Sequence, residues 1–220
     1  MIVGTNGIVL SYTKYRDTSI ITKILTENYG LHSFIVNNIR SARSKRSMGL
    51  FQPFNLVEIL SYWKDDASIH RLSDIKLQLP LHSIQSDIHR TTLALFLSEI
   101  LQKVFFHDQN EIKTTYHFVK NSIISLENID RGVENFHLQF LLKLAPFLGF
   151  GIEKAELMGA NDLFEEQIVD QLLVSDYGLT LEINGNQRYS ILNLIIRFYQ
   201  SHIDYLANIK SLKVLHQIFH

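Results

Sequence analysis

The chain has 220 residues, of which 46% are hydrophobic and 20% charged, with a formal net charge of -1 and no cysteine. This composition is typical of a globular protein with a sizeable core and argues against extensive disorder. Without cysteine, a disulfide framework, a thiolate zinc site and a cysteine nucleophile are excluded. The first residues, MIVGTNGIVLSY, lack the basic start and long apolar run of a signal peptide, and no run approaches the ~18 apolar residues of a membrane helix. We therefore expect a cytoplasmic protein that does not enter a membrane.

The near-neutral total hides an uneven distribution of charge. Residues 1–79 carry ten lysine and arginine residues against six aspartate and glutamate residues, a net charge of +4. Residues 80–220 therefore carry -5. A basic part joined to an acidic part indicates a polyanion-facing surface on the basic part. An excess of this size can also arise by chance.

The first 79 residues show the short alternating runs that are typical of β-strands. The predicted strands cover residues 8–12, 20–25, 31–36, 56–62 and 69–79. Turn signals occur at Asn6-Gly7, at Asn28-Tyr29-Gly30 and at Asp65-Asp66. Five short strands in about eighty residues predict a small barrel such as an OB-fold.

After Pro80, apolar residues recur at spacings of three and four, as amphipathic helices require. The clearest case is Ile88 to Phe106, for which Asp87 or Ser86 is the candidate N-cap. Further helices are predicted over residues 112–126, 134–148, 191–206 and 210–219. Asn184-Gly185-Asn186 is interpreted as a turn between two short strands. The predicted fold class is α+β, with an OB-fold barrel over residues 1–79 and a mainly helical domain over residues 80–220.

The sequence contains none of the common catalytic and metal-binding motifs. The sequence has no Walker A loop, no GxGxxG after a strand, no HExxH, no GxSxG and no EF-hand loop. The one helical i,i+4 histidine pair, His216 with His220, lies at a chain end, which is a poor place to fix metal geometry. Adjacent carboxylates such as Glu165-Glu166 do not face each other and indicate a solvated face. We therefore predict no enzyme activity, no metal and no cofactor.

The most unusual stretch is the segment Ile39 to Gly49, IRSARSKRSMG, in a region without acidic residues between Glu27 and Glu58. Four cations fall within seven residues of it, at Arg40, Arg43, Lys45 and Arg46. Arginine suits phosphate because its planar guanidinium donates two parallel hydrogen bonds, and serine hydroxyls can add contacts that read no sequence. The predicted function of this loop is to bind the phosphates of DNA. A flexible, solubilising connection between strands is the alternative.

Further cations and several aromatic residues surround this loop in the predicted barrel. The flanking candidates for DNA contact are Lys14, Arg16 and Lys23. Aromatic side chains in such barrels can stack on bases. The nearby aromatic residues are Tyr12, Tyr15, Tyr29, Phe34 and Phe51, and several of them must belong to the core.

The order of motifs resembles the RecO family of bacterial recombination mediators. An entry strand is followed by YRDTSIITKILTENYGLHSFIV, by the basic serine-containing loop and by GLFQPFNLVEI. Similar family features are the acidic Asp17 before an apolar strand, the turn Thr26 to Gly30 and the element Phe51 to Phe54. In the second half, ENFHLQFLLKLAPFLGFGI and IKSLKVLHQIF resemble the family's long helix with its leucine-glycine turn and its closing helix. The resemblance spans nearly the whole chain in the right order.

This resemblance implies an N-terminal OB-fold, a C-terminal helical domain and a role in DNA repair and homologous recombination. It implies binding of single- and double-stranded DNA, annealing of complementary strands and, together with RecR, loading of RecA on single strands coated by SSB. It also implies that the helical domain binds the C-terminal tail of SSB. Many family members carry a four-cysteine zinc module where this chain has the cysteine-free residues 152–187, so zinc is not carried over.

We therefore expect a non-enzymatic DNA-binding mediator in the cytoplasm, associated with the nucleoid when on DNA. The second hypothesis is a protein-interaction scaffold whose basic loop meets an acidic protein instead of DNA. Steep salt dependence of DNA binding without sequence preference would separate the two.

Overall fold

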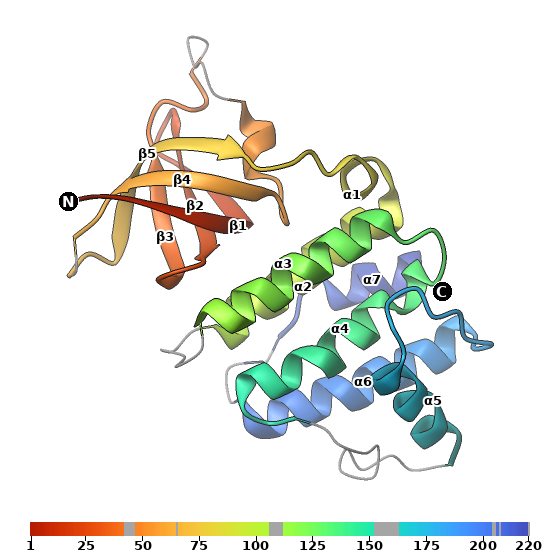
Figure 1. Cartoon of the computed structure of the whole chain (residues 1–220). Coiled ribbons are helices and arrows are strands. Elements are labelled where there is room, and N and C mark those ends of the chain that lie inside the picture. The colour runs from red at the N-terminus through yellow and green to blue at the C-terminus, as the bar shows by residue number, and fades with distance from the viewer. Residues whose placement is uncertain are drawn as a thin grey trace. The chain divides into compact units, whose positions relative to one another are not determined.

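The computed structural model describes residues 1–41, 47–64, 66–105, 112–151, 163–203, 206 and 208–219 (Figure 1). Its contacts divide the chain into two compact units, Met1–Leu81 with Phe105–Lys120 and His82–Val104 with Asn121–His220. The elements of the first part of the chain are β1 (Ile2–Tyr15), β2 (Ser19–Thr26), β3 (Gly30–Val36), the 3-10 helix η1 (Met48–Phe51), β4 (Leu56–Tyr62) and β5 (Ile69–Leu77). They are followed by α1 (His82–Ser86), α2 (Ile88–Val104), α3 (Ile112–Asn128), η2 (Val133–Asn135), α4 (Phe136–Leu144), η3 (Ala145–Leu148), α5 (Leu163–Val174), α6 (Gly185–His202) and α7 (Leu212–Ile218).

The five strands form a closed barrel in the order β1-β2-β3-β5-β4, with β4 returning to β1. The pairing of β3 with β5 is parallel, and the other four pairings are antiparallel. A closed five-stranded barrel that is completed in this way is OB-like, so the predicted barrel is confirmed. With the helices that follow, the chain is α+β, as the sequence predicts.

The barrel closes because β1 is long enough to pair with two neighbours. Its first half pairs with β4 through Ile2 to Ile8, and its second half pairs with β2 through Gly7 to Tyr15. A register shift between Val9 and Ser11 marks a bulge, and bulges bend strands at barrel corners. The predicted turn signal Asn6-Gly7 is therefore not a turn. Gly7 is needed inside the strand because a Cβ there would lie 2.5 Å from the Ile24 Cγ2 atom.

Alternating side chains of the strands fill the barrel interior. Ile20, Ile24, Phe34 and Val57 are fully buried, and the 3-10 helix η1 adds the fully buried Phe51. Burying aliphatic and aromatic side chains of this size contributes roughly 1.5–3 kcal/mol each. This core fixes the strands from which the outward-facing residues project.

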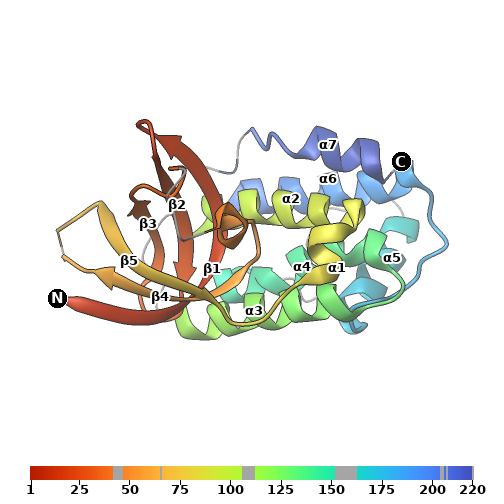
Figure 2. The same ribbon diagram turned by 90° about the horizontal axis from the view of Figure 1, so that it is seen from above.

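In the second unit, α2, α4 and α6 bury most of their apolar residues, and α7 contacts α2 (Figure 2). Hydrogen bonds from polar side chains connect these helices. Tyr199 of α6 donates to the Leu141 carbonyl at 2.6 Å, and the buried Arg188 donates to the Asn135 side chain at 2.9 Å. Burial, assisted by the charge of Arg188, lowers the pKa of the buried His137 to about 3, so this imidazole is neutral at neutral pH.

Three predictions for the helical half need correction. The helix predicted over residues 191–206 is α6, which begins earlier, at Gly185, and ends at His202. Asn184-Gly185-Asn186 does not join two strands, because Asn184 caps α6 and exchanges hydrogen bonds of 3.0 and 2.9 Å with Gln187 in a capping box. The predicted helix 134–148 is α-helical only as far as Leu144 and then continues as a 3-10 helix. Pro146 lacks the N–H that an α-helix would need there. Asp87 is the N-cap of α2, because its Oδ1 atom accepts a hydrogen bond of 2.9 Å from the Arg90 N–H.

None of the described helices is long and apolar enough to cross a membrane. The described residues contain no group of three or more histidine, aspartate or glutamate side chains placed to hold a metal ion.

Candidate nucleic-acid interface

The turn between β1 and β2 is joined to the segment that follows β3. The Arg40 N–H donates to the Thr18 carbonyl at 2.9 Å, and the Thr18 hydroxyl donates to the Asn38 side chain at 3.1 Å. The Ser19 hydroxyl donates to the Asn37 side chain at 3.3 Å. We refer to residues 16–19 and 37–41 as the basic end of the barrel. These hydrogen bonds fix the residues that directly precede residues 42–46 in the sequence.

The Arg40 side chain also takes part in this connection, which we call the joint between the β1–β2 turn and residues 37–41. Its Nη2 atom donates to the Arg16 carbonyl at 2.6 Å, and its Nε atom donates to the Ser19 carbonyl at 3.3 Å. The guanidinium thus crosses from the stem of the basic loop to the β1–β2 turn. Arg40, which is predicted to contact phosphate, therefore also holds two cation-bearing segments together.

The structure places the other predicted cations in different surroundings. Lys14 is exposed near the end of β1, and Arg16 is exposed in the turn at a φ of 49°. Lys23 is half-buried on β2, opposite Ser11 and Ser33, on the outer wall of the barrel. Arg16 and Arg40 are therefore brought together, while Lys23 is placed farther along the wall. The remaining candidates, Arg43, Lys45 and Arg46, lie outside the described residues.

Most of the aromatic residues considered for base stacking belong to the core. Phe34 and Phe51 are fully buried, and Tyr12 and Tyr29 pack against the barrel core. Tyr29 also lies 4.5 Å from the Trp63 ring, centroid to centroid. Tyr15 is the half-buried aromatic residue next to the basic end, with the Arg16 guanidinium 5.2 Å from its ring centroid.

Replacing Arg40 by lysine should lower the free energy of unfolding by about 1–2 kcal/mol, although the charge is conserved. The ammonium of lysine cannot reproduce the planar fork that reaches two carbonyls at once. Urea unfolding of the variant measures the loss, and Arg197→Lys on the exposed face of α6 is the matched control. An Arg40→Lys protein with wild-type stability would show that the crossing guanidinium does not hold the joint.

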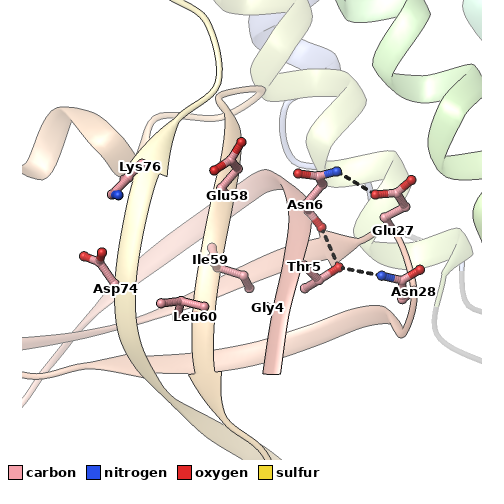
Figure 3. A pocket seen from close by; sticks show the side chains of 10 residues that line it. All are labelled: Gly4, Thr5, Asn6, Glu27, Asn28, Glu58, Ile59, Leu60, Asp74 and Lys76. Carbon is pink, nitrogen blue, oxygen red and sulfur yellow. Dashed lines mark hydrogen bonds between the residues drawn. The ribbon is translucent and has the colours of Figure 1, made fainter. Parts of the chain in front are cut away.

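A second surface of the barrel was not found by sequence reasoning. It is a groove of about 410 Å³ on the outer side of β1, β4 and β5, which Figure 3 shows. Its lining residues are Gly4, Thr5, Asn6, Glu27, Asn28, Glu58, Ile59, Leu60, Asp74 and Lys76. Residues far apart in sequence meet here through strand pairing alone, so no local signal could reveal it.

The groove has the opposite charge to the basic end. Three carboxylates line it, against one lysine. Glu27 accepts from the Asn6 side chain at 2.7 Å, and its other oxygen lies 3.3 Å from the His117 ring within the same unit. Gln78 donates to the Asn6 side chain at 2.6 Å, which fixes this rim further. A groove of this charge does not suit phosphate.

Comparison with known proteins agrees with this architecture. The family model "Recombination protein O N terminal" matches residues 1–80, and "Recombination protein O C terminal" matches residues 85–155. The chain belongs to the RecO family. The two matches correspond in order to the OB-like barrel and to the helical region that follows it.

Of three RecO-family relatives, two are similar over the whole chain, and the third is similar over 68% of it. The DNA repair protein RecO of Flavobacterium psychrophilum is 29% identical, and that of Azobacteroides pseudotrichonymphae is 27% identical, with all of both chains covered in each case. The DNA repair protein RecO of Phocaeicola vulgatus is 33% identical over 68% of this chain and 61% of its own length. The protein is therefore a RecO-family DNA repair protein.

Proposed function

We propose that this RecO-family protein is a non-enzymatic mediator that captures DNA phosphates with the basic end of its barrel and with the cations of residues 42–46, which follow it in the sequence. Arg43, Lys45 and Arg46 are the principal contacts, and Lys14, Arg16 and Arg40 flank them. Lys23 extends the same electrostatic surface along the outer wall of β2. In this proposal, residues 1–79 form the DNA-binding domain and residues 80–220 form a platform for protein partners.

The observation that carries the proposal is the hydrogen-bonded joint between Arg16 and Arg40. These residues are far apart in sequence, and the 2.6 Å hydrogen bond between the Arg40 guanidinium and the Arg16 carbonyl brings their segments together. Arg43, Lys45 and Arg46 follow Arg40 within six residues of sequence. Clustered cations neutralise neighbouring phosphates and release condensed counterions, and this gives affinity without sequence preference.

The partners and steps proposed for the protein follow from its family. It binds single- and double-stranded DNA, anneals complementary strands and, with RecR, promotes loading of RecA on SSB-coated single strands. The C-terminal tail of SSB binds the helical domain. These events take place in the cytoplasm, on the nucleoid, and need no cofactor; no zinc takes part because residues 152–187 contain no thiolate.

Titration of labelled single strands at several salt concentrations tests this function. We expect a linear fall of log affinity with log salt, with a slope of roughly 0.7 per phosphate contact, and similar affinities for unrelated sequences. The competing scaffold function predicts weak DNA binding at every salt concentration. DNA hydrolysis in added Mg²⁺ would contradict the non-enzymatic part of the proposal.

A further inference from the structure

Gly4 stands at a position where the fold does not require glycine. It is exposed on β1, opposite Leu60 of β4, and its φ lies outside the left-handed region. A Cβ at this position would meet the Leu60 Cδ2 atom at 3.2 Å, which is the far end of a flexible side chain. Glycine within a strand weakens it and often marks a place where another molecule approaches the backbone closely. Gly4 therefore differs from Gly7, which the packing of the barrel interior requires.

Strand register arranges the neighbours of Gly4 in three rows across β1, β4 and β5. The rows are Ile2–Tyr62–Arg71, Gly4–Leu60–Asp74 and Asn6–Glu58–Lys76. We call this surface, made by these nine residues, the Gly4 face. Figure 3 shows its second and third rows lining the groove, with Leu60 beside Gly4.

The Gly4 face combines exposed apolar side chains with carboxylates. Ile2, Leu60 and Tyr62 are 63%, 45% and 47% exposed. Leu60 lies directly between Gly4 and Asp74 in the register, and Glu58 projects from the same side of β4. Large apolar side chains gathered on a surface and flanked by charge mark an interaction site.

The charge of the groove selects the class of partner. Glu27, Glu58 and Asp74 line the groove against Lys76, whereas Arg71 of the first row is outside the groove lining, with its guanidinium 5.7 Å from the centroid of the Tyr62 ring. The second and third rows would therefore repel a phosphate backbone and attract a cationic side chain. The barrel is closed, so β1 and β4 pair with each other and offer no free edge for an added strand. Binding must therefore use side chains set against the outer wall.

We propose that the Gly4 face binds an extended segment of a partner protein that carries an apolar side chain flanked by lysine or arginine. The apolar side chain lies over Gly4, against Leu60 and Tyr62. The flanking cations face Glu58 and Asp74. This site goes beyond the proposed DNA binding and does not depend on it, because the two surfaces share no residue.

The full-length protein can be titrated with a fluorescein-labelled peptide that has the core Lys-Leu-Lys-Leu-Lys. A second peptide with glutamate in place of lysine controls for hydrophobic adsorption. Binding of the lysine peptide should shift the amide resonances of Gly4, Leu60 and Asp74 in a two-dimensional NMR spectrum. The glutamate peptide should bind at least about tenfold more weakly, because like charges oppose its approach.

Three variants locate the site, and two of them have matched controls. Gly4→Val fills the space above Gly4 and should weaken peptide binding about tenfold. Because it replaces a strand glycine by a β-branched residue, it should leave the stability of the protein unchanged or raise it. Leu60→Ser should also weaken peptide binding about tenfold. Its control is Val214→Ser, at a similarly exposed position on α7. Glu58→Gln with Asp74→Asn should also lower affinity about tenfold, whereas Asp66→Asn with Asp130→Asn, which removes the same total charge elsewhere, should not.

Several results would overturn the proposal. Equal affinity of all variants for the lysine peptide, or equal affinity of wild type for both peptides, would mean that adsorption is unspecific. Resonance shifts elsewhere would place the peptide on another surface. If Leu60→Ser converted an oligomer into a monomer in light scattering, the face would be a contact between copies of this chain. Loss of DNA binding in the basic loop variants would leave the peptide result unchanged, so the two functions fail independently.

Discussion

Replacing Arg43, Lys45 and Arg46 together by glutamine should weaken binding to single-stranded DNA about 100-fold at ~0.1 M salt. Each phosphate contact contributes about 0.7 to the log–log salt slope on single strands, so loss of three contacts should flatten that slope by about 2. On duplex DNA each contact contributes about 0.9, and the slope should flatten by nearly 3. The loss should be similar for unrelated DNA sequences because phosphate contacts carry no base information.

Glutamine keeps the chain as far as Cδ and a polar end group while it removes the charge, so a control that removes the same charge elsewhere is possible. Lys113, Arg197 and Lys213 are exposed cations on α3, α6 and α7, and their joint replacement by glutamine removes the same charge. We expect this control to retain the wild-type salt slope. Parallel slopes for wild type and the loop variant would mean that the loop is only a connection between strands. Normal DNA binding by the loop variant, with loss of an acidic protein partner, would favour the scaffold function.

Gly132→Ala should destabilise the protein by about 2–5 kcal/mol, the largest loss of stability that we expect from a single methyl group in this chain. Gly132 has a φ of 68°, a left-handed conformation that costs a residue with a side chain roughly 1–2 kcal/mol. In addition, a Cβ there would lie 2.6 Å from the Gly178 carbonyl carbon and from the Leu179 carbonyl oxygen. Backbone atoms cannot rotate away as a flexible side chain can, so the connection before α6 must shift.

Gly149→Ala separates the two causes of this loss. Gly149 has a φ of 87°, but a Cβ there would have no atom within 4 Å among the described residues. We expect it to lose only about 1–2 kcal/mol from strain. Thermal unfolding should show the difference, because 1 kcal/mol corresponds to about 2–4 °C in a chain of this size. Equal losses for the two variants would mean that the segment around Gly178 yields easily.

Local patterns in the sequence were sufficient for the helices whose apolar spacing is regular. The predicted helices over 88–106 and 112–126 correspond to α2 (Ile88–Val104) and α3 (Ile112–Asn128). The alternating runs likewise predicted strands that became the barrel. Both periodicities arise from backbone geometry within a few residues, so they can be read without knowledge of the rest of the chain. The turn predicted at Asn184 failed because asparagine serves both turns and N-caps, and the capping partner Gln187 decides between them.

The sequence by itself determined the α+β class, the OB-like barrel followed by a helical region, the RecO family and the concentration of cations between Arg40 and Arg46. The tertiary structure alone decided what those residues meet. It brought Arg40 onto the Arg16 carbonyl, placed Lys23 on the outer wall of β2, and set Leu60 between Gly4 and Asp74. These relations depend on strand order and register, which come from the closing of the whole barrel around its core. Periodicity records which face of an element is buried, but it does not record which distant residue lies opposite.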